Sequence, residues 1–243
     1  MAISCRNCPL RDHAIFEPMT ESEIEYMQEF KTGELEVQPG TLLMMEGSNS
    51  PQLFTPLEGM GLRYKTLEGG ERQVINFVMP GDFIGLQAGV MSEMQHSVEA
   101  TTAMRLCVFN RQAVWSLFRD HPARAYDLTW VAAVEEHLLG ENLAILGQMG
   151  GIERVARALL RLYDRARAMK MTKGREMPLP YKQQDLADAL GLSLVHTNKT
   201  LKTLRGQGVI EWKKGVLKVL DYEKLCEVAE VGSDRTPMTR PLI

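Results

Sequence analysis

The sequence predicts an α+β protein with a strand-rich N-terminal half, a long central helix and a small helical domain near the C-terminus. Three observations support this prediction. Short β-type runs alternate with turn residues from residue 34 to about 111, an apolar-periodic stretch follows from 122 to 149, and residues 181–215 resemble two short helices and a hairpin. At 243 residues the chain is long enough for two domains.

The N-terminal half is expected to begin with a short helix and to continue as a β-roll. Thr20 and Glu23 have the spacing of a capping box, which predicts a helix over residues 18–30. The β-type runs that follow are separated by turn pairs such as Gly69-Gly70 and Pro80-Gly81. Strands at such regular intervals are typical of a jelly roll or barrel. We therefore expect residues 1–120 to form a β-roll domain.

A long helix is predicted over residues 121–150. Its apolar residues recur with the alternating spacing of three and four that is typical of a coiled-coil dimer. Two polar residues, Glu135 and Asn142, interrupt this row, and Gly150-Gly151 ends the helix. We expect a dimer interface made of Leu128, Val131, Leu138, Asn142, Ile145 and Met149.

Residues 151–233 are expected to form a winged helix-turn-helix domain. Apolar residues fall on one helical face of residues 183–190, and Gly191 is well suited to end that helix. Ser193 is a good N-cap for a second helix, and two short strands around Lys214-Gly215 form the wing. Such a module presents its second helix to the major groove of DNA. Residues 234–243 are expected to be a flexible tail.

Charge favours DNA as the partner of this domain. Residues 151–220 hold 15 Lys and Arg residues against 6 acidic ones, a difference of +9, whereas residues 1–150 hold 10 basic against 20 acidic residues. The net charge of −3 for the whole chain therefore conceals a basic module joined to an acidic one. Neutralising DNA phosphates requires a positive surface. By spacing alone, two amphipathic helices joined by a glycine turn are also common in all-α proteins.

Several other classes of protein are disfavoured. No run approaches the roughly 20 apolar residues that span a bilayer, and the N-terminus lacks a signal-peptide hydrophobic region, so we expect a cytoplasmic protein with no membrane partner. Because the sequence has no phosphate loop, nucleophile elbow or HExxH helix, we do not expect an enzyme. Four cysteines are too few for a disulfide framework, which favours reduced thiols or a metal site.

Taken together, these elements resemble the family of the cyclic-AMP receptor and the fumarate-nitrate-reduction regulator (Crp/Fnr), which are transcription regulators. Two motifs support the resemblance, Pro80-Gly-Asp-Phe-Ile-Gly85 in the roll and Asp185-Leu-Ala-Asp-Ala-Leu-Gly-Leu-Ser193 in the helix-turn-helix. The resemblance covers nearly the whole chain. It implies a cyclic-nucleotide-binding-like β-roll, a homodimer on a palindromic operator in double-stranded DNA, and RNA polymerase as a further partner.

The chain departs from the cyclic-nucleotide branch of this family. That branch has a Glu for the ribose and an Arg-Ser pair for the cyclic phosphate, where this chain has Leu86 and His96-Ser97. A buried phosphate without the arginine lacks its bidentate partner, so we do not expect cyclic AMP as the effector. A cyclic-nucleotide-binding regulatory subunit remains a remote alternative.

The oxygen-sensing branch binds an iron–sulfur cluster through three N-terminal cysteines and one in the roll. Cys5, Cys8 and Cys107 match three of these places, but Ala14 or Phe16 stands where the remaining cysteine is expected. A site with four protein ligands would need a substitute such as His13 or Asp12. We therefore expect no cofactor. A redox sensor that uses an iron–sulfur cluster or haem stays open, with the three cysteines as candidate ligands.

The resemblance also implies which residues contact DNA. Counted from Gly191, the base-reading residues of the family correspond to Leu194, Val195 and Lys199. An aliphatic side chain cannot accept the cytosine N4 proton but can pack on a thymine methyl group, and a lysine can donate to guanine. Phosphate contacts are expected from Ser193, His196 and Lys202, whereas Asn198 stays undecided between base and backbone. The expected DNA-binding set is Ser193, Leu194, Val195, His196, Asn198, Lys199 and Lys202.

Overall fold

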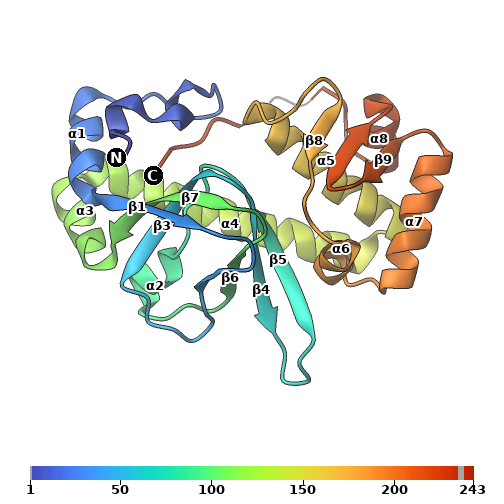
Figure 1. Cartoon of the computed structure of the whole chain (residues 1–243), viewed down its shortest axis with the longest axis horizontal. Coiled ribbons are helices and arrows are strands. Elements are labelled where there is room, and N and C mark those ends of the chain that lie inside the picture. Colours follow the sequence, from blue (N-terminus) through green and yellow to red (C-terminus); the bar gives the residue numbers. More distant parts are fainter. Residues whose placement is uncertain (1, 235–237) are drawn as a thin grey trace. The chain divides into compact units, whose positions relative to one another are not determined.

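The structure is a computed structural model that describes residues 2–234 and 238–243. The chain divides into two compact units (Figure 1). Unit 1 comprises Met1–Glu136 and Thr239–Ile243, and unit 2 comprises His137–Met238. The boundary lies inside the long helix α4 (Pro122–Gln148), so this helix contributes to both units. The α+β class predicted from the sequence is confirmed.

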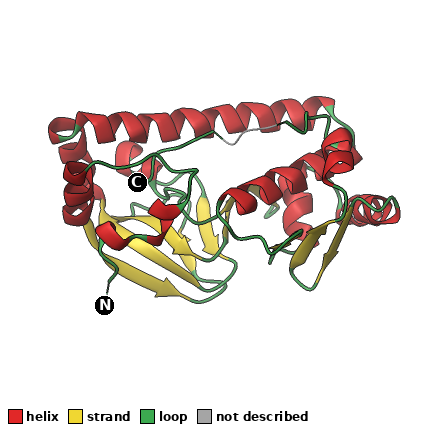
Figure 2. Ribbon diagram, turned by 90° about the horizontal axis from the view of Figure 1, so that it is seen from above, coloured by secondary structure: helices red, strands yellow, loops and turns green. Residues whose placement is uncertain are grey.

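Unit 1 contains the β-roll, whose strands are yellow in Figure 2. It begins with two 3-10 turns and α1 (Glu21–Phe30), which has the expected capping box between Thr20 and Glu23. The roll also holds α2 (Leu86–Met91) and is followed by α3 (Val114–Asp120). The strands of the roll are β1 (Lys31–Val37), β2 (Leu42–Met44), β3 (Gln52–Glu58), β4 (Gly61–Thr66), β5 (Arg72–Val78), β6 (Ser97–Ala100) and β7 (Met104–Asn110).

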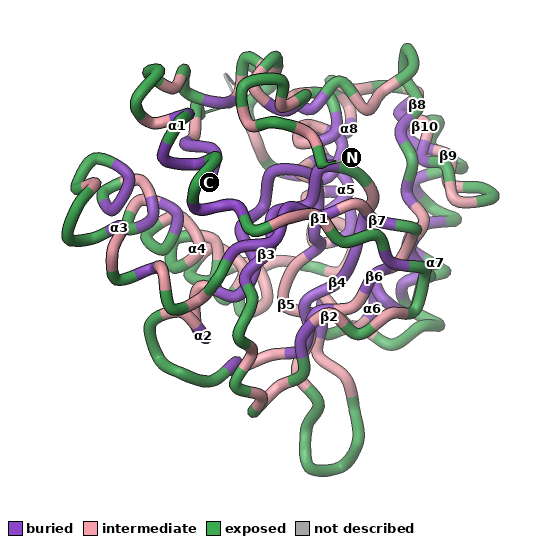
Figure 3. The backbone as a smooth tube through the Cα atoms, turned by 60° about the vertical axis from the view of Figure 1, so that its left-hand side comes forward, coloured by how far each residue is buried: buried purple, intermediate pink, exposed green. Residues whose placement is uncertain are grey.

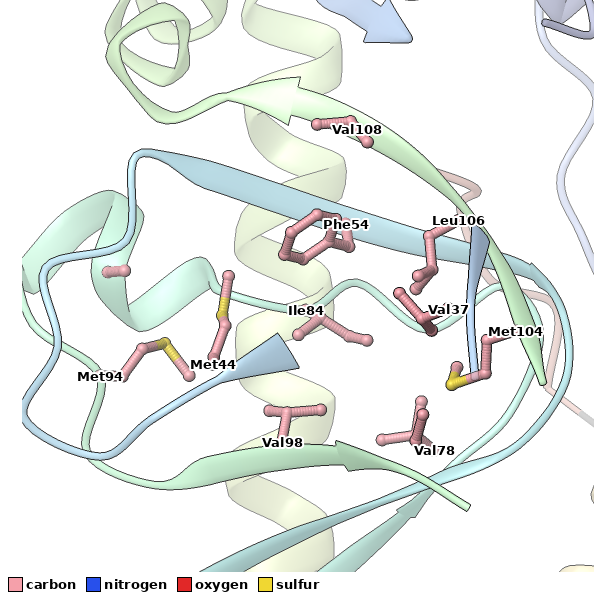
Figure 4. Packing of buried hydrophobic residues seen from close by; sticks show 12 residues of the cluster. Val37, Met44, Phe54, Val78, Ile84, Met94, Val98, Met104, Leu106 and Val108 are labelled. Carbon is pink, nitrogen blue, oxygen red and sulfur yellow. The ribbon is translucent and has the colours of Figure 1, made fainter. Parts of the chain in front are cut away.

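Two antiparallel sheets form the roll and enclose an apolar core. One has the strand order β1-β7-β3 and the other β2-β6-β4-β5. Buried residues run along β3 and the first half of β4 (Figure 3). Aliphatic, aromatic and methionine side chains meet in the interior, as Figure 4 shows for Val37, Met44, Phe54, Val78, Ile84, Met94, Val98, Met104, Leu106 and Val108. These side chains form the apolar core that holds the two sheets of the roll together.

The Pro80-Gly81-Asp82 turn requires its glycine. Gly81 has a φ of +81°, a conformation that other residues adopt only with strain, and a Cβ atom there would overlap the ring of Phe16. Asp82 Oδ2 accepts a hydrogen bond from the backbone N–H of Met79 at 2.9 Å, which closes the turn. This motif therefore fixes the loop after β5 against the N-terminal segment.

Unit 2 contains the winged helix-turn-helix. Its three-stranded antiparallel sheet has the order β8-β10-β9, so the wing has one strand more than the two expected. The elements that follow α4 are α5 (Gly151–Ala168), β8 (Glu176–Pro178), α6 (Gln183–Leu190), α7 (Leu194–Gly206), β9 (Ile210–Lys213), β10 (Val216–Val219) and α8 (Tyr222–Val228).

The expected helix boundaries in unit 2 are confirmed. Gly191 has a φ of +61° and ends α6, while the side chain of Ser193 caps α7 by accepting from the backbone N–H of His196 at 3.1 Å. Lys214 and Gly215 both have positive φ, with values of +49° and +74°, in the turn between β9 and β10. Such a pair of conformations suits a two-residue hairpin turn.

The end of the chain differs from the flexible tail expected over residues 234–243. Residues 235–237 lie outside the described part of the chain, but Thr239–Ile243 belong to unit 1. Leu242 and Ile243 are 4% and 5% exposed. The expectation is thus wrong for the last five residues, because two aliphatic side chains at the end are buried in the β-roll domain.

Candidate DNA-binding surface, dimer helix and ligand sites

Helix α7 has one face buried in unit 2 and the opposite face exposed. Its buried residues are Thr197, Thr200, Leu201 and Leu204, which pack it against the rest of the domain. The residues expected to contact DNA are all exposed: Ser193, Leu194, Val195, His196, Asn198, Lys199 and Lys202. The structure therefore places these seven side chains together at the surface of one helix and its N-cap.

Two apolar side chains stand out on this polar face. Val195 is 79% exposed and Leu194 is 39% exposed. Full burial of such an aliphatic side chain contributes about 1.5–3 kcal/mol. Exposed apolar side chains beside Lys199 and Lys202 suit a partner that offers both methyl groups and negative charge, as the major groove of DNA does.

The N-terminal end of α7 has two polar residues with different surroundings. The hydroxyl oxygen of Ser193 serves as the helix cap, which leaves its proton able to donate to a phosphate. The imidazole ring of His196 lies so close to Gly151 that a Cβ atom at Gly151 would overlap Nε2. The His196 ring is therefore packed on the first turn of α5 while the residue as a whole stays exposed.

A hollow beside α7 brings in residues that the expected set does not contain. It has a volume of about 170 Å³ and is lined by Gln183, Asn198, Leu201, Lys202, Arg205, Ile210 and Trp212. Trp212 is held there by a hydrogen bond from its Nε1 to the carbonyl of Leu179 at 3.2 Å. Gln183 at the start of α6 lies outside the expected set, because nothing in the spacing of apolar residues distinguishes it from other exposed polar residues.

Several residues of α4 that were expected in the dimer interface pack against other parts of the same chain. Leu128 and Val131 are 1% and 6% exposed in unit 1. Asn142 Oδ1 accepts a hydrogen bond from Arg161 Nη1 at 2.8 Å in unit 2, and Glu135 pairs with Arg63 at 3.1 Å in unit 1. Leu138, Ile145 and Met149 are half-buried.

A different face of α4 is exposed. Its two leucines each follow a residue of the expected seam by one position in the sequence. Leu139 and Leu143 are 51% and 73% exposed. They lie at a spacing of four together with small exposed residues on the same side of the helix, namely Ala132, Ala133, Gly140, Ala144 and Gly147. Leu128 and Val131 must therefore be removed from the expected interface, because the chain's own core already covers them.

The cysteines near the N-terminus lie next to a buried ion pair. Lys31 Nζ donates to Glu34 Oε1 and to the carbonyl of Ile3, both at 2.6 Å. Burial raises the pKa of the Cys107 thiol to about 11, although the positive charge of Lys31 opposes this rise. Burial is also the largest influence on Cys5 and Cys8, and it raises the pKa of both thiols.

These thiols do not fit a four-thiolate cluster. Such a cluster needs four thiolates, and Cys5, Cys8 and Cys107 supply three, since the remaining cysteine, Cys226, belongs to unit 2. Within residues 2–234 and 238–243, no three side chains of His, Cys, Asp or Glu are placed to hold a metal ion. His13, considered as a substitute ligand, ends the second 3-10 turn and lines a hollow with Arg11.

The residues at the cyclic-nucleotide positions are unsuited to a phosphate. Ser97 is buried, and its hydroxyl oxygen accepts from the backbone N–H of Glu46 at 3.0 Å. Burial, assisted by the positive charge of Arg63, lowers the pKa of His96 to about 4. His96 is therefore neutral at pH 7. Leu86 begins α2 and offers no hydrogen bond from its side chain to a ribose.

No helix among the described residues is both long and apolar enough to cross a membrane.

Both halves of the chain match known protein families. Residues 34–121 match the family described as "Cyclic nucleotide-binding domain", and residues 153–228 match "Crp-like helix-turn-helix domain". The nitrogen fixation regulation protein FixK of Rhizobium meliloti is 30% identical over 172 residues, which cover 71% of this chain and 75% of that protein. The transcriptional activator protein FnrL of Cereibacter sphaeroides is 26% identical over 235 residues, or 95% of this chain and 93% of that protein.

Solved structures show the same fold. FixK2 from Bradyrhizobium japonicum superposes with a TM-score of 0.74 at 23% sequence identity, over 82% of this chain and 98% of that chain. A regulator of the CRP/FNR family from Thermus thermophilus, TTHA1359, superposes with a TM-score of 0.66 at 23% identity, over 81% and 98%. At these identities the likeness is one of fold.

Proposed function

The chain belongs to the Crp/Fnr family of DNA-binding transcription regulators, and from that premise we propose that it acts as a homodimer on a palindromic operator and does not take cyclic AMP as its effector. One observation supports this proposal more strongly than the others. The exposed face of α7 has no carboxylate and combines two lysines with the 79% exposed Val195, in a domain with a charge difference of +9 over residues 151–220. Such a face complements phosphates and thymine methyl groups.

We assign each residue of this face a role in the proposed complex. Lys199 donates to guanine O6 and N7, and Leu194 and Val195 pack on thymine methyl groups. Phosphates accept hydrogen bonds from Ser193 and Lys202, and Asn198 contacts a base or the backbone. His196 contributes a phosphate contact only from the ring edge that faces away from Gly151, since its other edge is packed there.

The dimer is proposed to form through the exposed face of α4. Leu139 and Leu143 are the largest exposed apolar side chains in this half of the helix, and the glycines and alanines beside them allow two helices to approach closely. A parallel pair of such helices would place two α7 helices on successive half-sites about 34 Å apart. In functional terms we assign residues 1–120 to the sensor, 121–150 to dimerisation and 151–233 to DNA binding.

The proposal that cyclic AMP is not the effector is supported by the residues of the roll. Apolar side chains pack between the two sheets, and the neutral, half-buried His96 stands at the position of the phosphate-binding arginine. The redox alternative is disfavoured because Ala14 or Phe16 stands where a fourth thiolate is expected beside Cys5, Cys8 and Cys107. RNA polymerase is proposed as a partner because the similar FnrL is named a transcriptional activator.

Selection of bound duplexes from a random DNA library by the purified chain tests the proposed function. We expect enrichment of one palindrome whose half-sites lie one helical turn apart. The same selection with added cyclic AMP should yield the same palindrome in the same amount. Enrichment of no sequence, or of a sequence without two-fold symmetry, would contradict the proposal.

A further inference from the structure

Arg240 anchors the C-terminal segment, residues 239–243, to a defined site on unit 1. Its Nη1 lies 3.1 Å from Asp82 Oδ1, and its Nη2 donates to the carbonyl of Gly81 at 3.0 Å. The guanidinium carbon lies 5.8 Å from the centroid of the Phe16 ring, within the range of a cation–π contact. One arginine thus contacts a carboxylate, a carbonyl and an aromatic ring.

The backbone of the same residue is also paired. Arg240 N donates to the carbonyl of Ile15 at 2.8 Å, and Glu17 N donates to the carbonyl of Arg240 at 2.9 Å. These two bonds form a short parallel bridge on either side of Phe16. Backbone pairing of this kind is how an extended peptide is held at a strand edge.

The end of the chain is buried beside β3, where Figures 1 and 3 place the C-terminus. The hydroxyl of Thr55 donates to the terminal carbonyl oxygen of Ile243 at 2.7 Å, and Arg124 donates to the carbonyl of Leu242. Thr55 and Arg124 are themselves only 2% and 3% exposed. Buried donors are costly when they lack acceptors, so the segment completes this site.

Docking of the C-terminal segment also affects unit 2, because unit 2 lies between that segment and the rest of unit 1 in the sequence. The chain enters unit 2 at His137 and leaves it at Met238, so a docked segment ties the second end of unit 2 to unit 1. A domain that is tethered at both ends moves less, so it loses less entropy when it binds a partner.

We propose that residues 239–243 form a latch, a C-terminal peptide bound by unit 1 that restrains the DNA-binding unit and thereby raises its affinity for a two-fold operator. The effect on affinity rests on the proposed function. The docking itself does not, and it is tested without DNA.

Digestion of the native full-length chain by a carboxypeptidase, followed by mass spectrometry, tests the docking. Release of Ile243 and Leu242 should be about tenfold slower from the wild type than from the Arg240→Ala variant, because only the undocked segment can be cleaved. Met238→Ala is the matched control: Met238 is 70% exposed and precedes the latch, so that variant should stay protected. Equally fast release from the wild type and Arg240→Ala would overturn the latch.

A second experiment supplies the segment from outside. A chain that ends at residue 238 should bind a fluorescent Thr-Arg-Pro-Leu-Ile peptide saturably, and the intact chain should not, since its site is filled. A peptide with Ala in place of Arg should bind about tenfold more weakly. Absence of peptide binding to the shortened chain, together with an unprotected terminus in the intact one, would exclude the site. Should the shortened chain fail to fold, the full-length Thr55→Val variant replaces it, with faster carboxypeptidase release as the expected result.

DNA affinity then tests the consequence of the latch. Arg240→Ala should bind the selected operator about three- to tenfold more weakly than the wild type, and Met238→Ala should bind like the wild type. A wild type with a protected terminus but no affinity for any DNA would refute the proposed function and leave the docking intact. Unchanged or tighter binding by Arg240→Ala, on DNA that the wild type binds, would refute the latch.

Discussion

Arg161 Nη1 donates a hydrogen bond to Asn142 Oδ1 at 2.8 Å, and this contact shows which way helix α4 faces. Asn142 has the spacing of a coiled-coil position, but its amide oxygen accepts a hydrogen bond within unit 2. A polar residue at the centre of a dimer seam would instead pair with its own copy. The side of α4 that is open to a partner is therefore the one that carries Leu139 and Leu143.

Substitution of Leu143 by Glu should separate the dimer. Leu143 is 73% exposed, so the change spares the core of the single chain but places two like charges at the proposed helix pair. Sedimentation equilibrium should give twice the 27.4 kDa chain mass for the wild type and the single mass for Leu143→Glu. Gln148→Glu, which adds the same charge at an exposed position on the side of α4 opposite Leu139, should stay dimeric. A dimeric Leu143→Glu variant would place the interface elsewhere.

Two lysines of α7 should contribute to DNA binding in different ways. Lys199→Ala should cost about 1–3 kcal/mol on the selected operator and relax the preference at one base pair, because a base contact is lost. Lys202→Ala should weaken binding to all sequences alike and lower the salt slope by roughly one unit per subunit. Fluorescence anisotropy on cognate and random duplexes over a range of salt measures both. Equal losses on the two duplexes for Lys199→Ala would argue that base reading comes from other residues or from DNA shape.

His96 should make the stability of the protein depend on pH. Its pKa is about 4 in the folded protein and 6.5 in its ordinary state, so the unfolded chain binds the proton first as the pH falls. The contribution of neutral His96 to the free energy of unfolding is fully present above pH 6.5. It is lost progressively as the pH falls to 4, because the unfolded chain then gains the proton and the folded chain does not. Between pH 7 and pH 5, wild type should lose roughly 2 kcal/mol of unfolding free energy more than His96→Gln does. Urea unfolding at the two values measures the difference, and identical losses would mean that His96 titrates normally.

The three neighbouring thiols should hold no iron–sulfur cluster. Ala14 or Phe16 stands where a fourth thiolate is expected, and Lys31 with Glu34 forms an ion pair beside Cys107. Anaerobically purified protein should contain neither iron nor sulfide in stoichiometric amounts, and its visible spectrum should show no cluster or haem. The variant with both Cys5→Ser and Cys8→Ser should bind the operator like the wild type. Stoichiometric iron and sulfide that disappear from this variant would reverse the assignment.

Local sequence signals predicted the helix boundaries correctly, because each boundary depends on a few neighbouring residues. The Thr20–Glu23 capping box, the Ser193 cap and the left-handed Gly191 all lie where the sequence indicates. The outward face of α7 followed from the same kind of signal. Its buried threonines and leucines alternate with exposed residues at helical spacing.

Features that depend on distant parts of the chain could not be predicted in this way. The spacing of apolar residues in α4 fits more than one face, and only the packing of Leu128 and Val131 in unit 1 shows which is covered. The last five residues contain nothing that marks a docking segment, since Ile243 meets Thr55 across 188 positions of sequence. The pairing of His196 with Gly151 is likewise a tertiary contact.

The central claim, that two copies of the chain place their α7 helices on two half-sites, is tested most directly by the mass of the complex with the selected duplex. Light scattering or native mass spectrometry should give two chains per duplex. Scrambling one half-site should lower the affinity by at least about tenfold, because one α7 helix then loses its base contacts. A complex with one chain per duplex, with affinity unchanged by scrambling a half-site, would contradict the account.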